Sequence, residues 1–304
     1  MAERKAYIFK EVANTKIAAD VYYGKEGIND THPIALYVHG GSFTLGAKEM
    51  LNKNYSNKLT ELGFVVVSPN YRLAPTINVF DGPVTDVRDA YTWAASKLPA
   101  LLEKDANVHV DPKRVVVFGH SCGGTLALLT ALLPNPPLAI LDLFGMIYLQ
   151  NEAFHTASTK PAPPLEDDFV NKVYKDIPPP TAGPSPFGPN GPNFADYRVA
   201  WMFKRINQGK HMSEVIADGD YARVDPATLF AKGFPPTYFI HGTADFLVPH
   251  SISQRAHDEL KNLGVETQIE LIEGAGHGFD AGAAPGDEKF TIISRGFDFL
   301  KAHV

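Results

Sequence analysis

Short runs of apolar residues alternate along the chain with segments in which apolar residues recur every three or four positions. The apolar runs, each about as long as a strand buried on both faces, cover residues 33–38, 64–68, 114–119, 138–144 and 236–241. The segments with helical spacing cover residues 86–98, 122–132, 251–263 and 288–302. Strands that alternate with helices predict an α/β protein with a doubly wound, mostly parallel sheet.

The first 23 residues follow a different pattern. Residues 7–12 and 16–23 alternate apolar and polar positions, and the short polar stretch Ala13-Asn14-Thr15 separates them. Two such runs joined by a short polar turn are typical of an antiparallel hairpin. We therefore expect the sheet to open with a hairpin before the parallel strands begin.

Prolines interrupt the alternation between residues 150 and 224. This interval holds ten of the 24 prolines of the chain, and proline removes a backbone donor and restricts the residue before it. The interval also carries many aromatic side chains, which a solvated linker would lack. We interpret residues 150–224 as a partly ordered cap inserted into one α/β domain of residues 1–304, whose core comprises residues 1–149 and 225–304.

Composition and charge restrict the function and the location. The 304 residues carry a net charge of -6 without a long run of either sign, which argues against nucleic-acid binding. Cys122 is the single cysteine, so no intramolecular disulfide forms and a multi-cysteine zinc site is excluded. The first residues match neither a signal peptide nor a membrane anchor, and we expect a cytoplasmic protein without stable membrane insertion.

The strongest chemical signal is the stretch Gly119-His120-Ser121-Cys122-Gly123, which lies between a predicted strand and a predicted helix. Glycines relieve crowding in a sharp turn of this kind, so that the serine oxygen projects above the sheet. The helix N-terminus behind the turn favours developing negative charge. Ser121 is therefore the candidate nucleophile.

A second glycine-rich stretch, His39-Gly40-Gly41-Ser42-Phe43, follows the predicted strand 33–38. Backbone N–H groups exposed by glycine can converge on an oxyanion. We expect Gly40, Gly41 and Ser42 to supply such donors, together with the N–H of Cys122, the residue after the nucleophile.

Five motifs in order resemble those of the hormone-sensitive-lipase-like carboxylesterases, which have the α/β-hydrolase fold. They are His39-Gly40-Gly41-Ser42, Asn70-Tyr71-Arg72-Leu73-Ala74-Pro75, Gly119-His120-Ser121-Cys122-Gly123-Gly124, His241-Gly242-Thr243-Ala244-Asp245 and Gly276-His277-Gly278-Phe279. The resemblance implies that Ser121 is the nucleophile, Asp245 the acid and His277 the base, in the chain order that this fold uses.

The chain departs from this family at three positions. Ser42 replaces the third glycine of the usual His-Gly-Gly-Gly motif, and His120 and Cys122 replace the usual neighbours of the nucleophile. We expect His120 to pack under the nucleophile and the Cys122 thiol to be a buried small group. Asp280, next to the histidine loop, is the rival to Asp245 as the acid.

Contacts with a substrate are expected from apolar residues that neighbour the catalytic motifs or lie in the cap. The candidates are Phe43, Thr44, Phe246, Leu247, Phe279 and Trp201. Core packing is the alternative role for aromatic residues of this kind.

The sequence thus predicts a serine hydrolase that cleaves an ester of a small or medium-sized apolar molecule through an acyl-enzyme. A non-hydrolytic enzyme on the same scaffold, for cyclisation, C–C bond formation or acyl transfer in a secondary-metabolite pathway, is the main alternative. A ligand-binding module without catalysis is the third interpretation. No cofactor or metal is expected, and the partner is a small-molecule substrate; the oligomeric state, a homodimer included, stays open.

Overall fold

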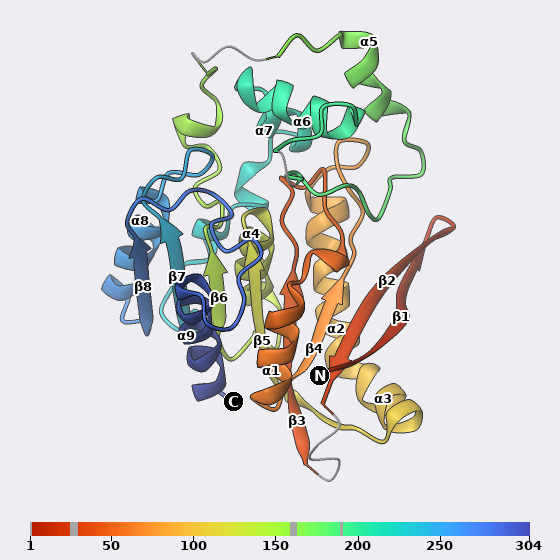
Figure 1. Cartoon of the computed structure of the whole chain (residues 1–304), viewed down its shortest axis with the longest axis vertical. Helices are drawn as coiled ribbons and strands as arrows, with labels where there is room; N and C mark the ends of the chain where they lie inside the picture. Colours follow the sequence, from red (N-terminus) through yellow and green to blue (C-terminus); the bar gives the residue numbers. More distant parts are fainter. Residues whose placement is uncertain (1, 25–29, 159–162, 189–190) are drawn as a thin grey trace.

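The computed structural model describes residues 2–24, 30–158, 163–188 and 191–304 (Figure 1). Within these residues eight strands form one sheet, in the order β1-β2-β4-β3-β5-β6-β7-β8. β1 and β2 pair antiparallel, as do β2 and β4, and all later neighbours pair parallel. The strands are β1 (Glu3–Val12), β2 (Thr15–Tyr23), β3 (Thr31–Val38), β4 (Val65–Pro69), β5 (His109–His120), β6 (Ile140–Leu143), β7 (Thr237–Gly242) and β8 (Thr267–Ile272).

Helices cover both faces of the sheet. One face carries α2 (Thr85–Ser96), α3 (Leu98–Ala106), α4 (Cys122–Leu128) and α8 (Ser251–Asn262), and the other carries α1 (Lys53–Glu61) and α9 (Glu288–Ala302). Alternate residues of β3 belong to the two apolar clusters, with Leu36 in one and Tyr37 in the other. The predicted doubly wound, mostly parallel sheet and its opening hairpin are thus confirmed.

Some elements differ from the prediction. β8 and α1 had not been expected. β8 is an edge strand whose residues are all half-buried or exposed, so it lacks the continuous apolar run of the central strands. The segment 86–98 is divided between α2, which ends at Ser96, and α3, which begins at Leu98 with Pro99 in its first turn, where proline is tolerated.

The interval between β6 and β7 holds the short helices α5 (Asp167–Val170) and α7 (His211–Val215) and the longer α6 (Tyr197–Asn207). In Figure 1 these helices lie beyond the carboxyl ends of the parallel strands. α6 forms after the last proline of the interval, where Asp196 caps its N-terminus. Residues 159–162 and 189–190 of the expected cap lie outside the described residues.

Arg198 of α6 ties this interval to the loops of the core. Its guanidinium donates to the backbone oxygen of Thr44 at 3.0 Å and to that of Ala74 at 2.6 Å, and it forms an ion pair with Asp176. The side chain is almost fully buried. Because a buried guanidinium needs its donors satisfied, these contacts hold α6 against the loop that follows β3.

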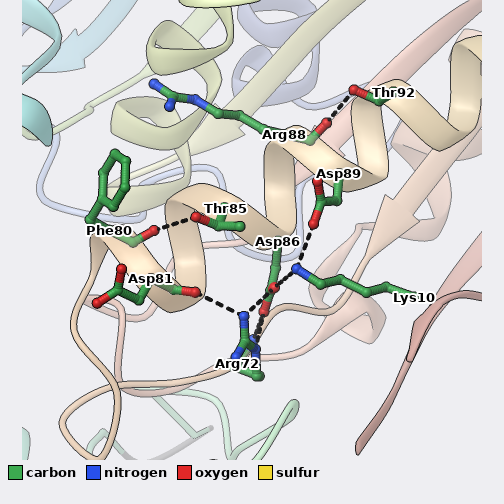
Figure 2. Close-up of polar contacts among 9 residues, drawn as sticks. All are labelled: Lys10, Arg72, Phe80, Asp81, Thr85, Asp86, Arg88, Asp89 and Thr92. Atoms are coloured by element: carbon green, nitrogen blue, oxygen red, sulfur yellow. Dashed lines mark hydrogen bonds and ion pairs between the residues drawn. The ribbon is translucent and has the colours of Figure 1, made fainter. Parts of the chain in front are cut away.

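A buried ionic cluster joins β1, the loop after β4 and α2 (Figure 2). The Asp86 carboxylate accepts from Lys10 Nζ at 2.6 Å, from the backbone N–H of Arg72 at 2.9 Å and from Arg72 Nε at 2.8 Å. Asp86 is fully buried. The cluster therefore fixes the start of the motif Arg72-Leu73-Ala74-Pro75 to the helix behind it.

Asp142 of β6 is a fully buried carboxyl group beneath the turn that carries Ser121. Neither of its oxygens makes a hydrogen bond within the described residues. A Cβ atom at Gly124 or Gly145 would overlap the Asp142 carboxyl group, so glycine is required at both positions. Burial raises the pKa of Asp142 from 3.8 to about 8, and the nearby Gly145 amide offsets this only in part.

The protonated form of Asp142 is therefore the one that folding favours. Because the pKa is higher in the folded protein, its contribution to stability is present below about pH 4 and is lost as the pH rises towards 8. Relative to Asp142→Asn, the free energy of unfolding of the wild type should fall by about 1 kcal/mol per pH unit between pH 5 and 7. Urea unfolding at several pH values measures this difference, and parallel pH profiles would contradict it.

Among the described residues, no helix combines the length and the apolar character needed to cross a lipid bilayer.

Candidate active site

Ser121 lies at the sharp turn between β5 and α4. Its backbone has φ 53° and ψ −127°, a conformation that non-glycine residues rarely adopt. The turn is held by the Ser121 N–H, which donates to the backbone oxygen of Leu143 at 2.8 Å. A Cβ atom at Gly119 or Gly123 would overlap neighbouring backbone. The glycines on both sides of Ser121 are thus required by close packing.

Asp245 follows β7 and accepts four hydrogen bonds. Its Oδ1 accepts from the backbone N–H groups of Leu247 and Val248 at 2.8 and 2.9 Å, and its Oδ2 accepts from His277 at 2.7 Å and His241 at 3.2 Å. Burial acts to raise the pKa of Asp245, but the hydrogen bonds from His241 and His277 and the charge of His277 hold it well below its usual range. The group is therefore an anion at neutral pH.

His277 lies on the loop after β8. Its Nδ1 donates to Asp245 at 2.7 Å, and the ring packs edge-on against Phe144 with 4.9 Å between ring centroids. Because Asp245 is ionised, Nδ1 carries the proton and Nε2 is the nitrogen that can accept one. His277 and Ser121 both lie on the wall of one cavity.

His241, at the end of β7, orients Asp245 from behind. Its Nε2 lies 3.2 Å from Asp245 Oδ2 and 3.0 Å from the backbone oxygen of Val248, and its Nδ1 lies 2.7 Å from Ser253 Oγ. Since the Val248 oxygen only accepts, Nε2 donates and Nδ1 accepts from the Ser253 hydroxyl. The sequence motif pointed to His241 but did not indicate this relay.

The glycine-rich loop, residues 39–43, bends beside Ser121. Gly41, Ser42 and Phe43 have φ values of 120°, 49° and 63°, and a Cβ atom at Gly41 would overlap the backbone of Leu45. A Cβ atom at Gly40 would lie 2.9 Å from the backbone oxygen of His120. The loop therefore packs directly on the turn of Ser121, and Ser42 adopts a left-handed conformation without being glycine.

The Cys122 side chain supports this loop from below. Its Sγ accepts from the backbone N–H of Phe43 at 3.1 Å and lies 3.8 Å from the hydroxyl of Tyr71. Tyr71 also donates to the His39 backbone oxygen at 2.9 Å and stacks on the His39 ring. Burial raises the pKa of the Cys122 thiol to about 11, so the thiol stays protonated and unreactive at neutral pH.

Asp280 pairs with His120 instead of with His277. Its Oδ2 lies 2.8 Å from His120 Nε2 and accepts from Tyr55 Oη at 2.9 Å. Burial acts to raise the pKa of Asp280, but the charge of His120 and the hydrogen bonds from His120 and Tyr55 lower it. Two separate histidine–aspartate pairs therefore flank Ser121. Asp245 binds His277, and Asp280 binds His120.

The cavity that holds Ser121 and His277 has a volume of about 930 Å³. Gly40, Gly41 and Ser42 line it at one side. Other wall residues come from the segment after β3, from the residue that follows β6 and from the cap interval, and include Met50, Phe144, Phe187 and Met202. In the described part of the chain, no group of three or more His, Cys, Asp or Glu side chains is placed to hold a metal ion.

The expected substrate contacts occupy different places. Leu247 lies on the cavity wall. Phe43, Thr44 and Trp201 are fully buried, Phe279 is buried against Phe144, and Phe246 is 67% exposed. Thr44 Oγ1 lies 3.3 Å from His211 Nε2, and the Trp201 indole donates to Tyr174. Among the described residues, these five side chains do not form part of the cavity wall.

Comparison with family models agrees with the sheet topology. A model described as "alpha/beta hydrolase fold" matches residues 35–162. A model described as "Dienelactone hydrolase family" matches residues 223–295. These two ranges contain Ser121 in the first and Asp245 and His277 in the second.

Relatives and solved structures match nearly the whole length of the chain. The non-reducing polyketide synthase pkbA of Emericella nidulans is 29% identical over 99% of this chain, which spans 14% of the length of that protein. Esterase 2 of Thermogutta terrifontis, phosphonylated by sarin, is 20% identical, with a TM-score of 0.66 over 97% of this chain and 93% of its own. A Staphylococcus aureus protein of unknown function is 21% identical, with a TM-score of 0.71 over 99% of both chains.

Proposed function

Because the chain is a protein of the α/β-hydrolase fold, we propose that it is a serine hydrolase acting on carboxylic esters. Ser121 is the nucleophile, His277 the base and Asp245 the acid. The single observation that carries this proposal is the 2.7 Å bond between His277 Nδ1 and the ionised Asp245, on the wall of the cavity that also holds Ser121. Because Nδ1 is engaged in that bond, the second ring nitrogen of His277, Nε2, can accept the proton of the serine hydroxyl.

The reaction begins when Ser121 Oγ attacks the ester carbonyl carbon and its proton passes to His277 Nε2. His277 then returns the proton to the leaving alkoxide, and the acyl group stays on Ser121. Water then attacks the acyl group with His277 as the base, and the carboxylic acid leaves as Ser121 regains its proton. Asp245 holds the ring of His277 in the required tautomer and offsets the charge that the ring gains.

The oxyanion formed in each step is stabilised by backbone N–H groups. Gly40, Gly41 and Ser42 from the glycine-rich loop and Cys122 at the start of α4 are the proposed donors. One such donor contributes roughly 3–4 kcal/mol to transition-state stabilisation in a comparable enzyme. Cys122 also receives the Phe43 N–H on its sulfur, so the same residue that supplies a donor holds the opposite loop in place.

The size and lining of the cavity support an organic ester of small or medium size. A volume of about 930 Å³ is of the order that drug-sized ligands occupy. Phe144, Phe187, Met202 and Leu247 give it apolar walls. These apolar walls, together with the polar residues that also line the cavity, favour a small organic molecule over a polymer.

The relatives favour a second candidate on the same catalytic residues. The relative named above and seven further curated relatives are non-reducing polyketide synthases, and the chain spans 12–15% of their length. In this candidate, Ser121 carries a polyketide acyl group, and a hydroxyl or carbon nucleophile other than water takes it. The attack on Ser121 and the role of His277 stay the same, and only the second acceptor differs.

A panel of p-nitrophenyl esters with acyl chains from two to ten carbons tests the primary proposal. We expect release of p-nitrophenolate well above the spontaneous rate, with a maximum of kcat/KM at a chain length that fills the cavity. The release is measured by absorbance, and the products are separated by chromatography. Added alcohols should yield only a minor ester product if water is the natural acceptor.

Folded protein that turns over no ester of the panel would count against hydrolysis. An acyl-enzyme that accumulates and breaks down only when an alcohol is added would support the second candidate instead. Mass spectrometry of the intact protein distinguishes the two, because the acylated chain is heavier by the mass of the acyl group.

A further inference from the structure

One end of the cavity is polar and lies beside His120, on the face of the sheet that α1 and α9 cover. Four side chains line this end: Tyr37 of β3, Tyr55 of α1, His120 and Asp280. The rings of Tyr37 and His120 meet edge to face with 5.4 Å between centroids. This end of the cavity is here called the tyrosine arm. The proposed ester chemistry does not use any of its four side chains.

Asp280 fixes the orientation of His120 in the arm. Since the carboxylate accepts, His120 Nε2 donates the 2.8 Å bond. Tyr55 donates to the same oxygen at 2.9 Å. The other ring nitrogen of His120, Nδ1, makes no hydrogen bond within the described part of the chain. This arrangement resembles that of Asp245 and His277. In each pair the carboxylate binds one ring nitrogen of the histidine, and the other ring nitrogen is available to a ligand.

Tyr37 offers a second polar group without a partner. Its side chain is 1% exposed, and its hydroxyl makes no hydrogen bond to any described residue. Burial and the nearby Asp280 charge raise the pKa of Tyr37 well above its usual value, so the hydroxyl keeps its proton. Because Tyr37 lies on the cavity wall, a ligand in the arm would give its hydroxyl a hydrogen-bond partner.

We propose that the tyrosine arm is a subsite that binds a hydroxyl group of the substrate, with Tyr37 donating a hydrogen bond to its oxygen and His120 Nδ1 accepting a hydrogen bond from it. This inference rests on the proposed ester chemistry at Ser121 and names the substrate class: an ester that carries a free hydroxyl group. Tyr37 and His120 are then the residues that determine specificity, and Asp280 and Tyr55 are positioning residues.

A hydroxyl group fits the arm better than a charged group. A carboxylate would face the ionised Asp280, which repels it. A neutral carbonyl would satisfy Tyr37 but would leave the lone pair of a neutral His120 unmatched. A hydroxyl both donates and accepts, so it satisfies Tyr37 and also His120 in either protonation state. Phe144, whose ring lies 5.7 Å from that of His120 and 4.9 Å from that of His277, separates the arm from the base.

Matched pairs of esters test this subsite. One series is p-nitrophenyl benzoate and its 2-, 3- and 4-hydroxy derivatives, and the other is phenyl acetate and the three monoacetates of dihydroxybenzenes. We expect at least one hydroxylated ester to exceed its parent in kcat/KM. Tyr37→Phe should lower that ratio about tenfold, as expected for one buried hydrogen bond. Comparing ratios between proteins removes differences in intrinsic ester reactivity.

Tyr238→Phe is the matched control, because the Tyr238 hydroxyl bonds Glu270 away from the cavity. It should leave the ratio unchanged. His120→Asn alters the hydrogen-bond acceptor. It replaces Tyr37→Phe in the test if thermal unfolding shows that the Tyr37 variant is not folded. Ratios that are the same in wild type, Tyr37→Phe and His120→Asn for every ester would overturn the subsite.

Binding to the Ser121→Ala variant distinguishes this inference from the proposed function. Calorimetric titration with the same esters measures affinity without turnover. One outcome would support the subsite and contradict the esterase proposal. In it, the protein binds a hydroxylated ester more tightly than the parent ester, Tyr37→Phe removes this preference, and the wild type hydrolyses neither ester. Hydrolysis by the wild type, without any effect of Tyr37→Phe on rate or affinity, would support the esterase proposal and contradict the subsite.

Discussion

Ser121→Ala is expected to lower kcat/KM for ester hydrolysis by about 10⁵-fold, because the variant lacks the oxygen that attacks the ester carbonyl. Both residues have a Cβ atom, so the unusual backbone conformation at φ 53° is no more strained in the variant. The protein should therefore unfold at nearly the same temperature as the wild type. Ester turnover and thermal unfolding, measured on the same preparations, check both halves of this expectation.

Ser294→Ala is the matched control. The Ser294 hydroxyl on α9 donates to the Phe290 backbone oxygen within the helix and lies outside the cavity wall, so this variant should keep the activity of the wild type. An organophosphonate that labels the wild type should leave Ser121→Ala unlabelled by intact mass. If Ser121→Ala hydrolysed esters within a factor of two of the wild type, the assignment of the nucleophile would be wrong.

Asp86→Asn is expected to lower the free energy of unfolding by about 3–5 kcal/mol, the range found when one partner of a buried ion pair is removed. The amide cannot balance the charges of Lys10 and Arg72, both of which point at position 86 (Figure 2) and are mostly buried. Urea denaturation at constant pH measures the loss. Because Arg72 begins the segment that leads to Ala74, and Ala74 donates to the Phe43 backbone oxygen at 2.9 Å, activity should fall as well.

Asp89→Asn is the control on the same helix. Asp89 also binds Lys10, but its side chain is 49% exposed, and exposed ion pairs contribute about 0–1 kcal/mol. The Asp89 variant should therefore stay close to the wild type. Equal losses in the two variants would contradict the view that burial of Asp86 makes its ion pairs important for stability.

The pairing of the acids illustrates what a linear motif leaves open. Asp245 and Asp280 both lie near His277 in the sequence or in the expected fold, and Asp280 is only three residues away. The structure gives Asp245 to His277 and Asp280 to His120. Sequence distance does not fix this choice, because the direction of each side chain depends on how the loop after β8 folds over the ends of β5 and β7.

The cavity wall was predicted least well. Residues that neighbour catalytic motifs were expected to contact substrate, yet Phe43 and Thr44 turn into the core and Phe246 points to solvent. The glycine-rich loop reverses direction at Gly41 and Ser42, and a reversal of this kind decides which side chain faces the cavity. Met50, Phe144 and Met202 line it from elements far apart in the sequence, and no local pattern marks them.

The sequence by itself determined the alternation of strands and helices, the opening hairpin and the turn of Ser121, because periodicity and glycine placement are local properties. It also indicated the order Ser121, Asp245, His277. Only the tertiary structure decided which acid meets which histidine, why the motif from Asn70 to Pro75 supports the glycine-rich loop, and that Tyr37 and His120 share one arm of the cavity. These features join residues of different strands and helices, and their distances are set by packing across the sheet.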